Sequence, residues 1–411
     1  MRKMSRWLAA LAALALVGAA CGNDSGTDTG ASDSGNQPTV DVVSEIGPTE
    51  DELNLIAWNG YTEDGTNYSS YDWVTPFEDE SGCKVNVKYA DTSDEMVTLM
   101  RQGGSYDGVS ASGDATNRLI AGGNVAAVDP ALFPDFANVI GPLNPEGGTN
   151  NSHYVVDGYV YGVPWMYGPN FLMYNTDVVK PAPESWDITF EADSPYAGQI
   201  TAYDSPIFIA DAALYLKAHN TELGIDDPYE LTPEQLDAAV ELLKTQSALI
   251  SKYWALYTDE IDGFVDGSMV AGTAWPINLT YAKADAPVAA VIPEEGVTGW
   301  ADTWMLNKEA DHPNCMLEWM RYSMLPEVQA TTGIFYGAAG SNAESCDLIA
   351  KGLGKDGKDL IDTVEYSFCG NEDFLTSIYL WKTPQATNAE GTSGFTDYSV
   401  WSQMWTEIRG A

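Results

Sequence analysis

The stretch LNLIAWNGY (53–61) begins the part of the chain that decides the fold. Its apolar first half predicts a buried strand. Trp58 and Tyr61 follow at the end of this strand, separated by an Asn-Gly pair. Two large aromatic side chains at this position fit either an ordinary strand end or the rim of a ligand site. The segments that follow help to choose between these interpretations.

Helical and extended segments alternate after this first strand. A helix is predicted over residues 71–80, a strand over 81–90, a second helix over 94–104, and a short strand that opens into a loop over 106–114. Such an alternation is typical of an α/β lobe with a largely parallel sheet.

Three later segments also predict regular structure. Residues 159–175 are aromatic and extended, and they predict two strands with a bend between them. The segment LTPEQLDAAVELLKTQS (231–247) predicts a helix, because Thr232 can cap it and the apolar residues recur on one face. Residues 313–333 predict a helix that breaks near Pro326.

The N-terminus predicts export. A basic start precedes a short apolar segment, and the small residues GAA (18–20) stand before Cys21. This arrangement resembles the lipobox of bacterial lipoproteins, although Gly18 stands where Leu is usual. We therefore expect a signal peptide over residues 1–20, a lipid on Cys21 and a flexible polar tether over residues 21–49. Cleavage without lipidation is the alternative.

The charge balance is strongly acidic. The chain contains 19 Lys and Arg against 60 Asp and Glu, for a net charge of -41. This balance argues against nucleic-acid binding, and its long-range field favours a cationic partner. An acid-rich surface also serves solubility alone, so the charge by itself identifies no site.

Four cysteines remain after Cys21, an even number that predicts two disulfides in an exported protein: Cys83, Cys315, Cys346 and Cys369. The three histidines lie far from these cysteines in the sequence, which argues against a zinc site. We expect no cofactor and no metal ion.

The sequence offers no convincing catalytic motif. GLGKDGK (352–358) approaches a phosphate-binding loop, but it follows a helix-like segment and lacks the Ser or Thr that would hold magnesium. No G-x-S-x-G motif occurs. Carboxylates are too numerous to locate an acid/base pair, so a secreted enzyme remains only a minor alternative.

Tryptophan and tyrosine outnumber phenylalanine, with 13 Trp and 22 Tyr against 11 Phe. This bias is typical of aromatic faces beside polar ligands or water. Several stand next to a carboxylate or a loop glycine at predicted strand ends: Trp58, Tyr61, Tyr203 with Asp204, Trp275, and Trp300 with Asp302. An aromatic wall beside a carboxylate can hold an organic ammonium. Each pair taken singly also fits ordinary core packing.

Several segments together resemble the extracytoplasmic solute-binding proteins of ABC importers, in particular the spermidine/putrescine-binding family. The resemblance covers residues 53–345 and, more weakly, the rest of the chain. The segments that carry it are WNGY (58–61), DEMVTLMRQGGSYDGVSASGDATNRLIAGG (94–123), YGVPWMYG (161–168), VAGTAWP (270–276) and IPEEGVTGWADTWMLNK (292–308).

The resemblance implies an α/β, two-lobe Venus-flytrap fold of the periplasmic-binding-protein type, with mixed sheets, flanking helices and a hinge. Lobe 1 would comprise residues 50–168 and 301–345. Lobe 2 would comprise residues 169–300 and 346–411. A small cationic solute would bind in the cleft between the lobes, and hinge closure would bury it.

The same division implies the disulfide pairs Cys83–Cys315 and Cys346–Cys369, one in each lobe. It also implies a monomer on the outer face of the cell membrane, held there by its lipid anchor, that delivers a polyamine to an ABC permease. A sensory binding protein with the same cleft is an alternative.

The ligand-binding residues follow from matching the family's motifs position by position. They are Trp58, Tyr61, Ser112, Asp114, Asp204, Trp275, Trp300, Asp302 and Tyr336. Three departures bear on the ligand: Gly60 and Ile207 stand where the polyamine group often has carboxylates, and Lys382 stands where an amide is usual. A betaine-like solute, an amino acid or a sugar therefore remains an alternative to putrescine or spermidine.

Overall fold

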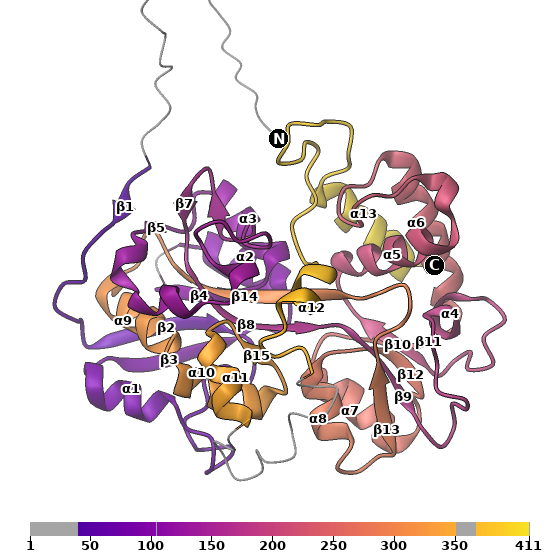
Figure 1. The fold of residues 1–411 in the computed structure, drawn as a ribbon, viewed down its shortest axis with the longest axis horizontal. Helices are drawn as coiled ribbons and strands as arrows, with labels where there is room; N and C mark the ends of the chain where they lie inside the picture. The colour runs from indigo at the N-terminus through magenta and orange to yellow at the C-terminus, as the bar shows by residue number, and fades with distance from the viewer. Residues whose placement is uncertain (1–39, 104, 351–366, 411) are drawn as a thin grey trace, which may run out of the picture. The chain divides into compact units, whose positions relative to one another are not determined.

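The computed structural model describes residues 40–103, 105–350 and 367–410. The predicted signal peptide, Cys21, most of the predicted tether and the GLGKDGK segment lie outside these residues. The strands that it describes form three sheets, which Figure 1 shows with their flanking helices. Among the described residues, no helix has the length and apolar character needed to span a membrane.

The largest sheet has seven strands, in the order β15-β8-β14-β4-β2-β3 with β16 beside β14. They are β2 (Glu52–Ala57), β3 (Lys84–Tyr89), β4 (Gly108–Ala111), β8 (Val163–Pro169), β14 (Thr298–Leu306), β15 (Ala339–Gly340) and β16 (Tyr379–Leu380). Strand β2 is parallel to β3 and β4, whereas β14 is antiparallel to β4 and β8. The expectation of a largely parallel sheet is therefore wrong, because β14 returns from far along the chain and inserts between β4 and β8.

The helices that pack against this sheet include α1 (Val74–Ser81), α2 (Ser93–Arg101), α3 (Gly113–Ala121), α9 (Pro313–Ser323), α10 (Pro326–Tyr336) and α11 (Ala343–Ala350). The prediction of a loop after the short strand at 106–114 is wrong, because α3 begins directly at Gly113. A Cβ atom on Gly113 would lie 1.8 Å from the carbonyl oxygen of Trp381. Glycine thus allows the segment after β16 to cross the start of α3.

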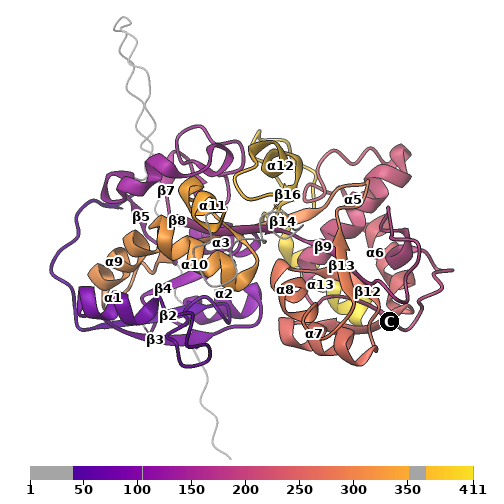
Figure 2. The same ribbon diagram turned by 60° about the horizontal axis from the view of Figure 1, so that its bottom comes forward.

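The second sheet has five strands in the order β11-β10-β12-β9-β13. They are β9 (Phe171–Asn175), β10 (Ile200–Tyr203), β11 (Ile250–Trp254), β12 (Ala271–Ala274) and β13 (Val288–Val291). The remaining helices are α4 (Asp187–Phe190), α5 (Ile209–His219), α6 (Pro233–Ser247), α7 (Tyr257–Asp266), α8 (Pro276–Ala282), α12 (Glu372–Ser377) and α13 (Tyr398–Arg409). Helices α5 to α8 surround this sheet (Figure 2). Thr232 caps helix α6, as its sequence predicts, and Gln235 completes a capping box with it.

A small third sheet corrects the expected end of the tether. It contains β1 (Val42–Val43), β5 (Ala127–Val128), β6 (Val155–Val156) and β7 (Tyr159–Val160). Because β1 pairs with β5, the folded part begins before residue 50. Short 3-10 helices connect these regions at Pro130–Leu132, Pro134–Asn138, Gly141–Leu143, Pro206–Phe208 and Thr221–Leu223.

The chain passes from the larger sheet to the smaller one and back again. It leaves the larger sheet at Pro169 and enters the smaller one at Phe171, and it returns between Val291 and Thr298. The division after residue 345 differs from the expectation, because α11 packs against α10 and β15 of the larger sheet. Disulfides join Cys83 to Cys315 and Cys346 to Cys369, the pairs that the family resemblance implies.

Candidate ligand-binding site

The ends of two neighbouring strands bring the first site residues together. Trp58 and Tyr61 follow β2, and Ser112 follows β4. Because β2 and β4 are parallel, their carboxyl ends reach the same edge of the sheet, where α/β proteins bind ligands. Asp302 lies on β14, whose pairing with β8 shifts in register between Ala301 and Thr303. Such irregularities redirect side chains beside functional sites.

These side chains line a small cavity. Its lining consists of Trp58, Tyr61, Ser112, Trp275, Trp300, Asp302, Tyr336 and Trp381. The free space for the centre of a water molecule is about 10 Å³, about enough for one water. Seven of the nine residues that the sequence assigned to the ligand are therefore gathered here. A solute larger than one water molecule exceeds this free space.

Among the residues that the structure describes, Asp302 is the only carboxylate in this lining. Its side chain is buried, and it accepts hydrogen bonds from the hydroxyl groups of Tyr61 at 2.7 Å and Ser112 at 2.5 Å. Both donors fix the orientation of the carboxylate. A carboxylate offers about four lone-pair positions, so Asp302 can still accept N–H groups from a ligand.

Burial raises the pKa of Asp302 to about 7, against the lowering effect of the hydrogen bonds from Ser112 and Tyr61. The negative charge of Asp114 raises the pKa further. Removal from water disfavours the charged form of a carboxyl group. A cation in the cavity would offset this cost, so the site favours a positively charged group beside Asp302.

Aromatic rings form the remaining walls. Trp58 and Trp275 meet edge to face, with ring centroids 5.9 Å apart, and Tyr61 lies 4.8 Å from Tyr336. Four lining residues have a buried indole Nε1 atom with no hydrogen-bond partner in the described part of the chain: Trp58, Trp275, Trp300 and Trp381. The cavity thus combines faces that attract cations with donors that ligand oxygens could satisfy.

Asp114 does not line the cavity. It is fully buried near the start of α3, where one oxygen accepts the hydroxyl of Ser93 at 2.8 Å and the other lies 3.8 Å from Arg118. Burial raises its pKa to about 6, although Arg118 acts in the opposite direction. Asp114 therefore acts on the site only through its charge near Asp302.

Asp204 is also absent from the lining. Its carboxylate accepts the indole N–H of Trp405 at 2.9 Å and pairs with Arg409 at 3.2 Å. Its neighbour Tyr203 instead packs 5.4 Å from Trp381. Asp204 is thus occupied by protein partners, and it joins β10 to α13.

Trp381 is the lining residue that the sequence assignment missed. It follows the short strand β16, so no periodic pattern marks it. The only signal was its position beside Lys382, which departs from the family. The ammonium group of Lys382 lies 2.8 Å from both Asp227 and Glu230, so it adds no cation to the cavity lining.

Gly60 has a steric reason to lack a side chain. Its φ is +93°, and a Cβ atom would lie 2.9 Å from Phe335 and 3.1 Å from Tyr336. A carboxylate at this position, as in many polyamine binders, does not fit this backbone. The conformation of the loop between Trp58 and Tyr61 therefore explains why it carries no carboxylate at position 60.

The two-sheet α/β architecture and the aromatic cavity define the class of solute-binding proteins with the periplasmic-binding-protein fold. A family model described as bacterial extracellular solute-binding protein matches residues 72–353. The chain belongs to this family.

Relatives and solved structures agree with this assignment. A putrescine/agmatine-binding protein of Pseudomonas aeruginosa is 25% identical over 338 residues, which cover 76% of this chain and 87% of the relative. The TpPotD lipoprotein of Treponema pallidum matches with a TM-score of 0.66 at 17% identity, covering 88% of this chain and all of that chain (100%). The spermidine/putrescine ABC transporter substrate-binding protein PotD of Streptococcus pneumoniae matches with a TM-score of 0.64 at 16% identity. The match covers 88% of this chain and 99% of that chain. The family assignment makes the chain a solute-binding protein and not an enzyme.

Proposed function

We propose that the cavity captures a small organic cation, with a polyamine such as putrescine or spermidine as the leading candidate. The observation that carries this proposal is the buried carboxylate of Asp302, held by Tyr61 and Ser112 beneath tryptophan walls. An ammonium group would donate to Asp302, and the methylene chain would lie against the rings. The relatives named for putrescine and agmatine support the same solute class.

A small zwitterion, such as a betaine or an amino acid, is the second candidate. The four unpartnered indole N–H groups favour it, because the amino groups of a polyamine supply donors and a zwitterion supplies oxygen acceptors. The described residues supply one carboxylate to the lining, which also suits one cationic head.

Calorimetry separates the candidates directly. Putrescine, spermidine, glycine betaine, amino acids and sugars are titrated into the purified protein. The proposal expects the tightest binding from a polyamine and a large loss of affinity in Asp302→Asn. Tight binding of an uncharged sugar that is unchanged in this variant would refute the cationic solute.

We also propose that the site is an interlobe cleft that opens for entry. The cavity combines Trp58 and Ser112, which follow strands of the larger sheet, with Trp275, which follows β12 of the smaller one. Opening at the crossings after Pro169 and before Thr298 would admit a ligand too large for this cavity. Small-angle scattering should then show a smaller radius of gyration when the solute is added, and an unchanged radius would contradict the opening.

The membrane attachment is a separate proposal. The segment before Cys21 supports lipidation of that cysteine, after which the protein would pass its solute to a membrane permease. Metabolic labelling with a fatty-acid probe should mark the wild-type chain and not Cys21→Ser. Equal labelling of both would refute the assignment.

A further inference from the structure

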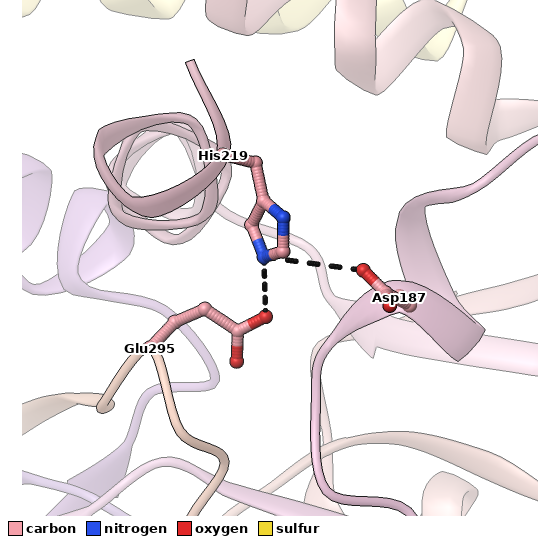
Figure 3. A group of neighbouring side chains, drawn as sticks. All are labelled: Asp187, His219 and Glu295. Atoms are coloured by element: carbon pink, nitrogen blue, oxygen red, sulfur yellow. Dashed lines mark hydrogen bonds and ion pairs between the residues drawn. The ribbon is translucent and has the colours of Figure 1, made fainter. Parts of the chain in front are cut away.

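A histidine and two carboxylates from distant segments converge near the start of β14 (Figure 3). Nε2 of His219, the last residue of α5, lies 2.8 Å from Oε1 of Glu295 and 3.9 Å from Oδ1 of Asp187. The three ligand atoms all lie within 4.8 Å of one another. His219 and Glu295 are 76 residues apart, so the sequence spacing that argued against a metal site could not reveal this group.

Neighbouring groups hold each of these side chains in place. Ser185 donates its hydroxyl to Oε1 of Glu295 at 2.5 Å. The hydroxyl of Tyr215 lies 2.7 Å from Oδ1 of Asp187, and its ring stacks on the imidazole of His219 with centroids 4.2 Å apart. Partners of this kind orient metal ligands in proteins.

The charges of the cluster are not balanced. The side chain of Glu295 is only 1% exposed, and among the described residues its ion-pair partner is His219. A single imidazole can offset at most one carboxylate, and a buried carboxylate needs a positive partner. Asp187 adds a second carboxylate, and Glu191 lies 2.6 Å from the hydroxyl of Tyr215. The net charge of the cluster is therefore negative, and the cluster also presents an imidazole nitrogen.

We propose that Asp187, His219 and Glu295 bind a divalent transition-metal ion, with Zn²⁺ as the best fit. Metal–ligand bonds of about 2.0–2.2 Å in a tetrahedral site place the ligand atoms roughly 3.3 Å apart. The two distances from His219, 2.8 and 3.9 Å, lie on either side of that value. One imidazole with two carboxylates suits zinc better than calcium or magnesium, which prefer oxygen ligands alone.

The metal site is distinct from the solute site. None of its three ligands lines the aromatic cavity. Glu295 precedes β14, and α5 is joined to the same strand because Asp211 accepts the hydroxyl of Thr298 at 2.9 Å. A bound ion would tie α4, α5 and the loop before β14 together, and β14 carries Trp300 and Asp302. The inference goes beyond the proposed function and does not depend on the identity of the solute.

Zinc titration tests the proposal on the tag-free full chain after treatment with EDTA. We expect one equivalent of Zn²⁺ to bind at neutral pH and the melting temperature to rise with it. His219→Gln and the exposed Asp187→Asn should each weaken binding by about tenfold or more. Circular dichroism checks that both variants keep the fold.

His312→Gln is the matched control, because His312 faces one carboxylate, Asp107 at 3.0 Å. Its zinc affinity should equal that of the wild type. Weak binding of several ions that is unaffected by the first two variants, or no binding at all, would overturn the proposal. Solute affinity measured with and without EDTA separates this outcome from any failure of the proposed solute site.

Discussion

The hydroxyl group of Tyr61 donates a 2.7 Å hydrogen bond to Oδ2 of Asp302, although 241 residues separate them in the sequence. Ser112 donates to the other oxygen across 190 residues. The end of β2, the end of β4 and the middle of β14 thus meet at one carboxylate. Because both donors are neutral, the charge of Asp302 remains available for a cation.

Replacing Asp302 with Asn should weaken binding of the cationic solute by at least tenfold. A charge-assisted hydrogen bond in a desolvated site contributes about 1.5–3 kcal/mol. Asn retains the size of the side chain, so the melting temperature should change little. Titration calorimetry measures the affinity, and an unchanged dissociation constant would refute the ammonium contact.

Asp204→Asn is the control for this experiment. The sequence assigned Asp204 to the ligand, but the structure pairs it with Trp405 and Arg409. Its substitution should therefore leave solute affinity within about twofold of the wild type, since surface ion pairs contribute little. A loss equal to that of Asp302→Asn would place Asp204 in the binding site after all.

Affinity for a cation should rise with pH around neutrality. The pKa of Asp302 is raised to about 7 by burial, and a cation binds the ionised form. Below this pH, binding must release a proton, so affinity should fall toward about tenfold per pH unit. Above about pH 8 it should level off.

Titrations in buffers of different ionisation enthalpy report this proton release. The protein should release a proton on binding at pH 6, and release should be nearly absent at pH 9. In Asp302→Asn the binding enthalpy at pH 6 should no longer depend on the ionisation enthalpy of the buffer. A dependence that persists in this variant would assign the released proton to another group.

The match to the family's motifs predicted the aromatic residues of the site, among them Trp58, Trp275 and Trp300. Local strand patterns alone fitted core packing equally well. Trp381 follows a strand of two residues, which gives no pattern. The fold class came from the family resemblance, whereas the mixed order of the larger sheet did not follow from local alternation, because β14 pairs with segments more than a hundred residues away in the sequence.

The two carboxylates that fell outside the cavity show a second limit. Asp114 forms an ion pair with Arg118, four residues later in the sequence. Asp204 forms an ion pair with Arg409 on the last helix. Position in a motif identified both as candidates. The structure is needed to show which carboxylates already pair with cations or accept hydrogen bonds within the protein. A count of carboxylates from the sequence therefore overestimates the negative charge available to a ligand.

Replacing Gly60 with Ala should destabilise the protein by about 2–4 kcal/mol. The residue adopts φ of +93°, and the added methyl group would press on Phe335 and Tyr336; backbone strain and overpacking each cost about 1–3 kcal/mol. Urea unfolding gives the free energy. Gly60→Asp should likewise lose stability and should not raise polyamine affinity.

Gly82→Ala provides the control, because Gly82 has φ of +76° but no atom within 4 Å of a Cβ position. Only the backbone strain applies there, about 1 kcal/mol. Equal losses at both positions would show that the aromatic contact at Gly60 contributes nothing. The comparison therefore isolates the crowding that excludes a carboxylate from the first binding loop.

Glu260 should make the protein less stable as the pH rises. Its side chain is fully buried on α7, and neither oxygen has a hydrogen-bond partner among the described residues. Burial raises its pKa well above 4.5. The folded state then holds a proton that the unfolded state loses. Its contribution to stability is therefore complete below the unfolded pKa and declines as the pH rises toward the folded pKa.

Unfolding by urea across a pH series should show this effect as a difference between wild type and Glu260→Gln, which cannot ionise. The stability of the wild type relative to this variant should fall steadily from about pH 4.5 upward. Glu241→Gln, at an exposed position beside Lys244, should show no comparable trend. Parallel curves of unfolding free energy against pH for wild type and Glu260→Gln would contradict this prediction. They would mean that Glu260 is not the source of the pH dependence.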